Sequence, residues 1–165
     1  MTQGTEMTDS TVAKDAIVGT WKLVEMKCVD EQGNISYPFG KDPVSYIIYT
    51  EEGHMSFSII MSNRLKMGLL VEEIMDMGYG RKPKINIFKY LKAGVRYLQA
   101  VQKYVGYMGK YEIKDNKVIQ HIEISVIPDL IGIDMERTLE ISGDILVLTG
   151  SYPQYRVDST LKRVS

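Results

Sequence analysis

The residues best suited to chemistry are His121 and Glu123, which lie two positions apart in a segment typical of a β-strand. Because side chains alternate along a strand, His121, Glu123 and Ser125 share one face, and Ile122 and Ile124 share the other. If the polar face lines a cavity, His121 can carry a proton near neutral pH and Glu123 can orient its ring. If the isoleucine face packs into a core instead, the polar face lies outside. The sequence leaves both alternatives open.

Arg137 follows on the next predicted strand, in register with mostly apolar neighbours. An arginine in this setting either lies at a rim, with its charge in water, or lies inside, paired with a carboxylate such as that of Glu123. An inner pair would bind a ligand carboxylate or stabilise an enolate. Tyr107 and Tyr111 share a face with Gly109 between them, which either makes room for packing or lets Tyr107 donate a hydrogen bond to a ligand.

The elements that position these residues are short strands separated by turn residues. Trp21 follows a small-residue turn at the start of the first strand, and Gly, Asn and Asp mark most of the later turns. The pattern predicts a mainly β fold, a closed eight-stranded antiparallel barrel wide enough to hold one small ligand. The predicted strands cover residues 20–29, 45–50, 55–61, 106–113, 118–127, 134–141, 145–149 and 156–164.

A long helical insertion, at about residues 65–105, separates the third predicted strand from the fourth. Apolar residues recur at three- and four-residue steps over 87–105, which predicts an amphipathic helix, and residues 69–77 predict a shorter one. Basic residues follow the opposite side of the long helix. They either form a solvated face or meet an anionic membrane or partner. The basic residues are Lys84, Lys89, Lys92, Arg96 and Lys103.

Composition excludes several classes of function. The 165 residues include 20 basic and 21 acidic ones, so the net charge of −1 gives no global field that would attract nucleic acid. The single cysteine, Cys28, cannot form an internal disulfide and fits a reducing compartment, so we expect a cytoplasmic protein. Cys28, His54 and His121 provide too few ligands for a closed zinc site of the usual kind, and no glycine-rich phosphate loop is present. We therefore expect no metal and no cofactor.

The remaining chain is expected to form one domain. Residues 1–15 are rich in Thr, Asp and Glu and predict a flexible tail without the apolar core of a signal peptide. Residues 16–165 are enough for one barrel domain with a sizeable core. No apolar run reaches the roughly 18 residues of a membrane span. The sequence gives no indication of the oligomeric state.

Several blocks of this sequence resemble the bacterial lipocalin-like domain proteins of the calycin barrel group, over about residues 17–165. The resemblance supports the closed barrel and implies that Arg163 lies over the face of the Trp21 indole. It also implies a polar His121 and Glu123 pair at a shared position. The blocks are GTWKLV at 19–24, YPFGKDP at 37–43, YTEEGHMS at 49–56, YMGKYEI at 107–113, then His121 and Glu123, Pro128, Gly132, Arg137 and a strand pair that ends at Leu148.

The expected function is to hold a small hydrophobic or amphiphilic molecule inside the barrel, with the helical insertion at its mouth. One alternative is a cofactor-independent isomerase, cyclase or dehydratase, in which His121 is the acid and base, Glu123 supports it, and Arg137 or Tyr107 stabilises an oxyanion. Another is a protein–protein interaction module that uses the exposed helix. The predicted ligand-binding residues are Tyr49, Met55, Phe57, Ile59, Tyr107, Tyr111, His121, Glu123 and Arg137.

Overall fold

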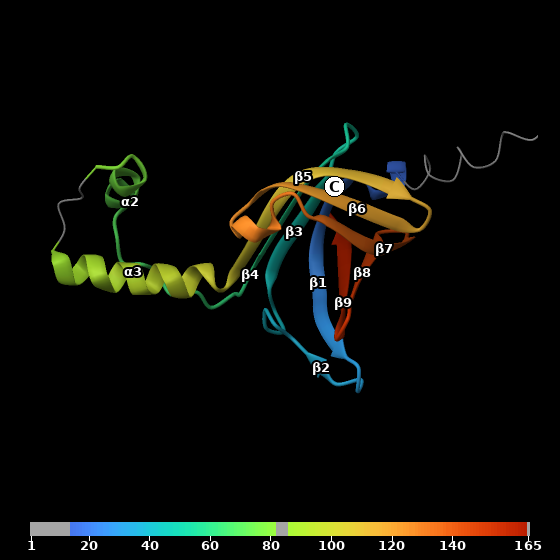
Figure 1. The fold of residues 1–165 in the computed structure, drawn as a ribbon, viewed down its shortest axis with the longest axis horizontal. Coiled ribbons are helices and arrows are strands. Elements are labelled where there is room, and N and C mark those ends of the chain that lie inside the picture. Colours follow the sequence, from blue (N-terminus) through green and yellow to red (C-terminus); the bar gives the residue numbers. More distant parts are fainter. Residues whose placement is uncertain (1–13, 82–85, 165) are drawn as a thin grey trace, which may run out of the picture. The chain divides into compact units, whose positions relative to one another are not determined.

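The computed structural model describes residues 14–81 and 86–164, and its main element is a large antiparallel sheet (Figure 1). Its strands match the predicted ones to within a few residues at each end. The strands are β1 (Gly19–Asp30), β2 (Ile35–Ser36), β3 (Val44–Tyr49), β4 (His54–Ile60), β5 (Tyr104–Lys114), β6 (Lys117–Ser125), β7 (Asp134–Ser142), β8 (Ile145–Tyr152) and β9 (Tyr155–Arg163). A 3₁₀ turn over Pro128–Leu130 lies between β6 and β7.

The sheet closes on itself, because β1 pairs with β3 along one side and with the last strand, β9, along the other. Eight strands, β1 and β3 to β9, therefore form a closed antiparallel barrel, as the sequence predicts. The two-residue strand β2, which the sequence did not reveal, pairs only with the end of β1, where Cys28 lies opposite Ser36. It adds a short flap at that end of the barrel.

Trp21 closes the opposite end of the barrel. Its side chain is fully buried, and its indole nitrogen donates a hydrogen bond to the carbonyl oxygen of Ile17 at 2.7 Å. Arg163 lies over the indole ring at 4.1 Å from the centroid, and its guanidinium also donates to the carbonyl oxygens of Val18 and Ala16. This confirms the expected cation–π contact. It ties the last strand to the residues that precede the first.

Two β-bulges decide which side chains face the interior. In β1 the pairing with β9 shifts between Leu23 and Glu25, so that Met26 and Cys28 point inward after Leu23. Between β5 and β6 the pairing skips Glu123, and Ile124 lies outside the barrel with 59% of its surface exposed. A bulge adds one residue to a strand and so reverses the alternation beyond it. The alternative in which Ile122 and Ile124 both face the core therefore holds only for Ile122.

The helical insertion forms a compact unit of its own, residues 63–104, between β4 and β5 in the chain. It is the predicted insertion between the third and fourth barrel strands. It contains α2 (Val71–Gly78) and α3 (Ile87–Val101), and α3 is shorter than predicted because Tyr104 and Val105 belong to β5. Asn86 starts α3 by accepting a hydrogen bond from the Phe88 amide at 2.8 Å. In the part of the chain that the structure describes, no helix is long and apolar enough to cross a bilayer.

The predicted tail, residues 1–15, falls largely outside the described residues, which begin at residue 14. Residues 14–17 form a single helical turn, and Ile17 at its end is fully buried in the barrel core beside Trp21. This turn is the first element in the described part of the chain.

Candidate functional site

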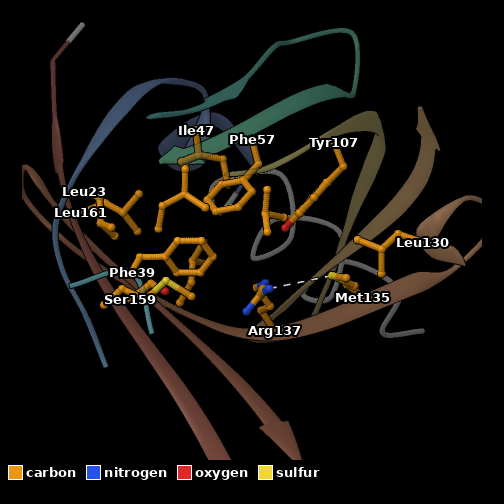
Figure 2. Close-up of a pocket in the computed structure, with 14 residues that line it drawn as sticks. Leu23, Phe39, Ile47, Phe57, Tyr107, Leu130, Met135, Arg137, Ser159 and Leu161 are labelled. Atoms are coloured by element: carbon orange, nitrogen blue, oxygen red, sulfur yellow. Dashed lines mark hydrogen bonds between the residues drawn. The ribbon is translucent and has the colours of Figure 1, made fainter. Parts of the chain in front are cut away.

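A small cavity of about 110 Å³ lies in the interior of the barrel (Figure 2). Its wall is almost entirely apolar, and the polar side chains that reach it are those of Tyr107, Arg137 and Ser159. Figure 2 shows the Tyr107 hydroxyl and the Arg137 guanidinium pointing into the space among the apolar groups. The other lining residues are Leu23, Met26, Phe39, Ile47, Phe57, Ile59, Val105, Leu130, Met135, Leu148 and Leu161.

A larger and more open pocket, of about 670 Å³, lies at the end of the barrel opposite Trp21. Residues from the end of β1, from β2 and from the turn between β8 and β9 form its wall, Cys28 and Tyr155 among them. It shares Met26, Phe39, Val105 and Arg137 with the inner cavity. We call this pocket the mouth of the barrel. Arg137 thus lies where the mouth meets the interior.

Among the residues that the structure describes, the charge on Arg137 has no carboxylate partner. None of the ion pairs among the described residues involves it, although its side chain is only partly exposed. Its Nη2 donates only a weak hydrogen bond to the sulfur of Met135, at 3.8 Å. Gly150 provides the room for the guanidinium, since a β-carbon there would lie 2.8 Å from Nη1. The expected pairing with Glu123 is therefore absent.

Tyr107 connects Arg137 to a buried chain of hydrogen bonds. The Tyr107 hydroxyl donates to Oε1 of Gln120 at 3.1 Å, and Nε2 of Gln120 donates to the Tyr49 hydroxyl at 2.7 Å. Gln120 is completely buried, so these bonds satisfy polar groups that would otherwise be costly. The chain holds the Tyr107 hydroxyl in a fixed direction beside the guanidinium.

The environment of the network keeps the arginine charged and the tyrosines neutral. Burial raises the pKa of Tyr107, and the charge and hydrogen bond of Arg137 offset only part of that increase. Burial also raises the pKa of Tyr49. For Arg137, burial opposes the charge; the attraction that raises the guanidinium pKa above its ordinary value comes from Tyr107, Tyr152 and Tyr49 once they ionise, well above neutral pH. The site therefore presents a positive charge to the cavity at neutral pH.

Four of the nine predicted ligand-binding residues line the inner cavity: Phe57, Ile59, Tyr107 and Arg137. Three more are buried in the core around the cavity without lining it. These three are Tyr49, Met55 and Tyr111. The Tyr111 ring packs edge-on against Tyr49 with centroids 4.9 Å apart, and its hydroxyl donates to the carbonyl oxygen of Thr50. These three residues belong to the packed core that surrounds the cavity.

The remaining two, His121 and Glu123, lie on the outer face of β6. His121 Nδ1 is 2.6 Å from a carboxylate oxygen of Asp134 and its Nε2 is 3.5 Å from Glu112, whereas Glu123 approaches Lys110 at 3.8 Å. Of the two alternatives for this strand, the structure has the one in which the polar face is outside. The reason is that Val118, Gln120 and Ile122 occupy the inner face of β6.

This placement separates the groups that the enzymatic alternative needs. Acid–base catalysis with His121 requires its ring and the Arg137 guanidinium to converge on one substrate position. They lie on opposite faces of the sheet, and the lining of the inner cavity contains neither a histidine nor a carboxylate. Among the described residues, no group of histidine, cysteine, aspartate or glutamate side chains is arranged to hold a metal ion.

Sequence reasoning missed Gln120, Gly150 and Phe39, which the structure brings to the site or to its support. Gln120 shares a face with Val118 and Ile122, so simple alternation from the isoleucine could have found it. Gly150 carries no signal in a single sequence, because its role depends on the guanidinium of another strand. Phe39 belongs to the YPFGKDP block, which sequence reasoning used only for the resemblance.

Comparisons with known proteins identify one family model and similar solved structures. A family model described as "Lipocalin-like domain" matches residues 18–163. The crystal structure of a lipocalin-like protein from Bacteroides uniformis is similar over 90% of this chain and 98% of that one, with 14% sequence identity and a TM-score of 0.42. An uncharacterized protein from Bacteroides eggerthii is similar over 89% and 98%, with 11% identity and a TM-score of 0.41. A search of curated proteins finds no match.

Proposed function

Because the chain belongs to the lipocalin-like domain family, we propose that its barrel binds a small amphiphile with an anionic group on Arg137 and an apolar end in the inner cavity. The observation that carries the proposal is the position of Arg137. This charged side chain has no carboxylate partner in the described part of the chain, and it lies where an apolar cavity meets an open mouth. An anionic amphiphile satisfies both parts of this site at once.

The argument for an anion rests on the cost of a partly desolvated charge. A guanidinium that has lost part of its water and gained no carboxylate is under-compensated inside the protein. A carboxylate or sulfonate can accept two parallel hydrogen bonds from it, and charge-assisted bonds of this kind are about twice as strong as neutral ones. The hydroxyl group of nearby Tyr107 donates its hydrogen bond to Gln120, so the guanidinium is the donor that remains for a ligand.

The size of the cavity limits the apolar part of the ligand. The inner space of about 110 Å³ is smaller than the engineered cavity of about 150 Å³ that binds benzene. The interior therefore takes one ring or a short chain, and the barrel centre is otherwise filled by side chains. The rest of the molecule would lie in the mouth, whose volume is about 670 Å³. We expect a slender ligand with its charge part of the way along, and not a bulky one enclosed in the barrel.

Three ligands with one chain length and different head groups test this proposal. We would measure how octanoate, octanol and octylammonium displace 1-anilinonaphthalene-8-sulfonate, a fluorescent apolar anion, from the full-length protein at pH 7. A hydrogen bond to a charged group contributes about 1.5–3 kcal/mol, so octanoate is expected to bind at least about tenfold more tightly than octanol. Octylammonium is expected to bind more weakly than either.

Two variants assign the preference to the guanidinium. In Arg137→Met the preference for octanoate over octanol should disappear, while octanol binding is retained because the apolar wall is intact. In Gly150→Ala the new methyl group displaces the guanidinium, so octanoate should weaken and octanol should not. Equal binding of octanoate and octanol to the unmodified protein would refute the anionic site. Failure of all three ligands and the probe to bind would refute a ligand site in the barrel.

A further inference from the structure

The helical unit, residues 63–104, is strongly basic, whereas the rest of the chain is acidic. The unit contains nine basic and three acidic residues, a net charge of +6, and the remaining residues contain eleven basic and 18 acidic ones, a net charge of −7. The overall charge of −1 conceals this division. A basic segment of this kind is attracted to anionic surfaces, from which the acidic remainder is repelled.

One face of α3 is occupied inside the helical unit. Ala93 is buried, and Lys89 Nζ lies 2.7 Å from a carboxylate oxygen of Glu73 at the start of α2. Arg96 Nη1 donates to the carbonyl oxygen of Lys66 at 3.1 Å. Helix α2 and the segment that precedes it therefore pack along this side of α3. Two of the five residues of the basic stripe that the sequence indicated, Lys89 and Arg96, are involved in these contacts.

The opposite face of α3 is apolar, and the helical unit does not cover it. At about 100° per residue, five large apolar side chains fall within an arc of roughly 100° on the helix surface. Each is more than half exposed, from 57% for Val95 to 77% for Phe88. Contiguous apolar surface of this kind on a soluble unit marks an interaction site. The five residues, which we call the apolar face, are Ile87, Phe88, Leu91, Val95 and Leu98.

The borders of the apolar face have the chemistry of a membrane interface. On one side lie Tyr90 and Tyr97, both about half exposed, whose rings are apolar and whose hydroxyls are polar. On the other side Lys92 is exposed next to Phe88 and Val95 on the helix surface. Aromatic rings and lysines beside an apolar helix face are typical of helices that lie in the plane of a bilayer surface.

We propose that α3 docks on the surface of an anionic lipid bilayer, with its apolar face among the lipid chains and Lys92 at the phosphate level. The charge of the helical unit and the apolar face favour this partner together, since an apolar face alone would not select an anionic surface. The helix lies on the membrane and does not cross it. This docking is independent of the ligand in the barrel.

Vesicle flotation with the full-length protein tests the docking. We would compare vesicles of phosphatidylcholine alone with vesicles of phosphatidylcholine and phosphatidylglycerol at three to one, at 50 mM and 500 mM salt. Binding is expected to the anionic vesicles at low salt, to weaken at high salt, and to be absent from the neutral ones. Absence of binding to the anionic vesicles at 50 mM salt would overturn the proposal, and so would equal binding to both compositions.

Matched variants distinguish binding through the apolar face of α3 from non-specific binding by the rest of the protein. Lys92→Glu should reduce the partition coefficient about 25-fold, at about fivefold for each of two charges, and Phe88→Ser should reduce it at least about tenfold. Ile124→Ser, on the outer face of the barrel, and Lys22→Glu, on β1, change an exposed apolar and an exposed basic residue elsewhere and should have little effect. Arg137→Met should bind vesicles as the unmodified protein does, which separates this test from that of the barrel ligand.

The acidic barrel of a second copy is the competing partner for this face. If that contact forms instead, sedimentation will show a dimer that Lys92→Glu dissociates, and the anionic vesicles will not bind. That result would overturn the membrane proposal.

Discussion

Replacing Arg137 by methionine should make the ligand-free protein more stable. The guanidinium is partly buried, has no ion pair among the described residues, and lines a cavity whose wall is otherwise almost entirely apolar. Methionine has a similar length and adapts to irregular space. The substitution removes a charge that the fold solvates poorly, and it leaves the hydrogen bond from Tyr107 to Gln120 in place.

The expected gain follows from two opposing effects. Replacing buried ion pairs by apolar groups of similar volume has stabilised proteins by up to about 1–4 kcal/mol. Against this stands the favourable interaction of the Arg137 charge with the nearby Tyr107 hydroxyl, which contributes no more than the about 1.5–3 kcal/mol of a hydrogen bond to a charged group. Since Arg137 is a single, partly exposed charge, we expect a net gain of about 1 kcal/mol. For a chain of 165 residues this raises Tm by about 2–4 °C.

Urea unfolding and thermal unfolding, followed by circular dichroism, measure this change. The control is Arg156→Met, because Arg156 is exposed and pairs with Asp158 at 2.9 Å, and its replacement should change stability by less than about 0.5 kcal/mol. A loss of more than about 1 kcal/mol in Arg137→Met would refute the view that this charge is under-compensated. With octanoate at 100 times its Kd for the unmodified protein the order should reverse. The ligand then stabilises the unmodified protein by about 2.7 kcal/mol and the variant, which binds it at least about tenfold more weakly, by at most about 1.4 kcal/mol.

Three other changes test the barrel itself. Gly109→Ala should destabilise it by about 3 kcal/mol in urea unfolding, because the new β-carbon would lie 1.9 Å from a carbonyl oxygen of the neighbouring strand; a neutral result would contradict the close approach. Arg163→Met should cost about 2 kcal/mol and shift Trp21 fluorescence to the red, since the indole loses its cover; an unchanged spectrum would count against the cap. The rate of Cys28 alkylation should rise with pH along a curve that lies at higher pH than that of a free cysteine, because burial and then Asp158 raise the thiol pKa. Asp158→Asn should move this curve to lower pH. A curve at or below the pH of a free cysteine would refute this.

The strands of the barrel were predictable because most of them obey simple alternation between turn residues. In β3, Ser45, Ile47 and Tyr49 are buried and the residues between them are exposed, as a strand with one face in a core requires. The contact at the closed end was predicted through the family resemblance, which implied that Arg163 lies over the Trp21 indole. Strands whose side chains alternate between core and solvent can therefore be located from the sequence alone.

The interior was harder to predict because bulges interrupt the alternation. Beyond the bulge in β1, Met26 and Cys28 face inward, although counting by two from Leu23 would select Glu25 and Lys27. Whether Arg137 lies inside or at the rim also depends on its neighbours from other strands. Such contacts form only when the barrel closes, and no local pattern encodes them.

The pairing of β1 with β9 has a consequence for how the chain is made. Trp21 lies opposite Arg163, so the edge of β1 that pairs with β9 has no partner until β9 has been synthesised. At about 5–20 residues per second, the wait at the ribosome is on the order of ten seconds. During that time the newly made strand carries unpaired amide and carbonyl groups along one edge, where other nascent chains can add. We therefore expect that the nascent chain is most prone to aggregate in the interval before β9 pairs with β1.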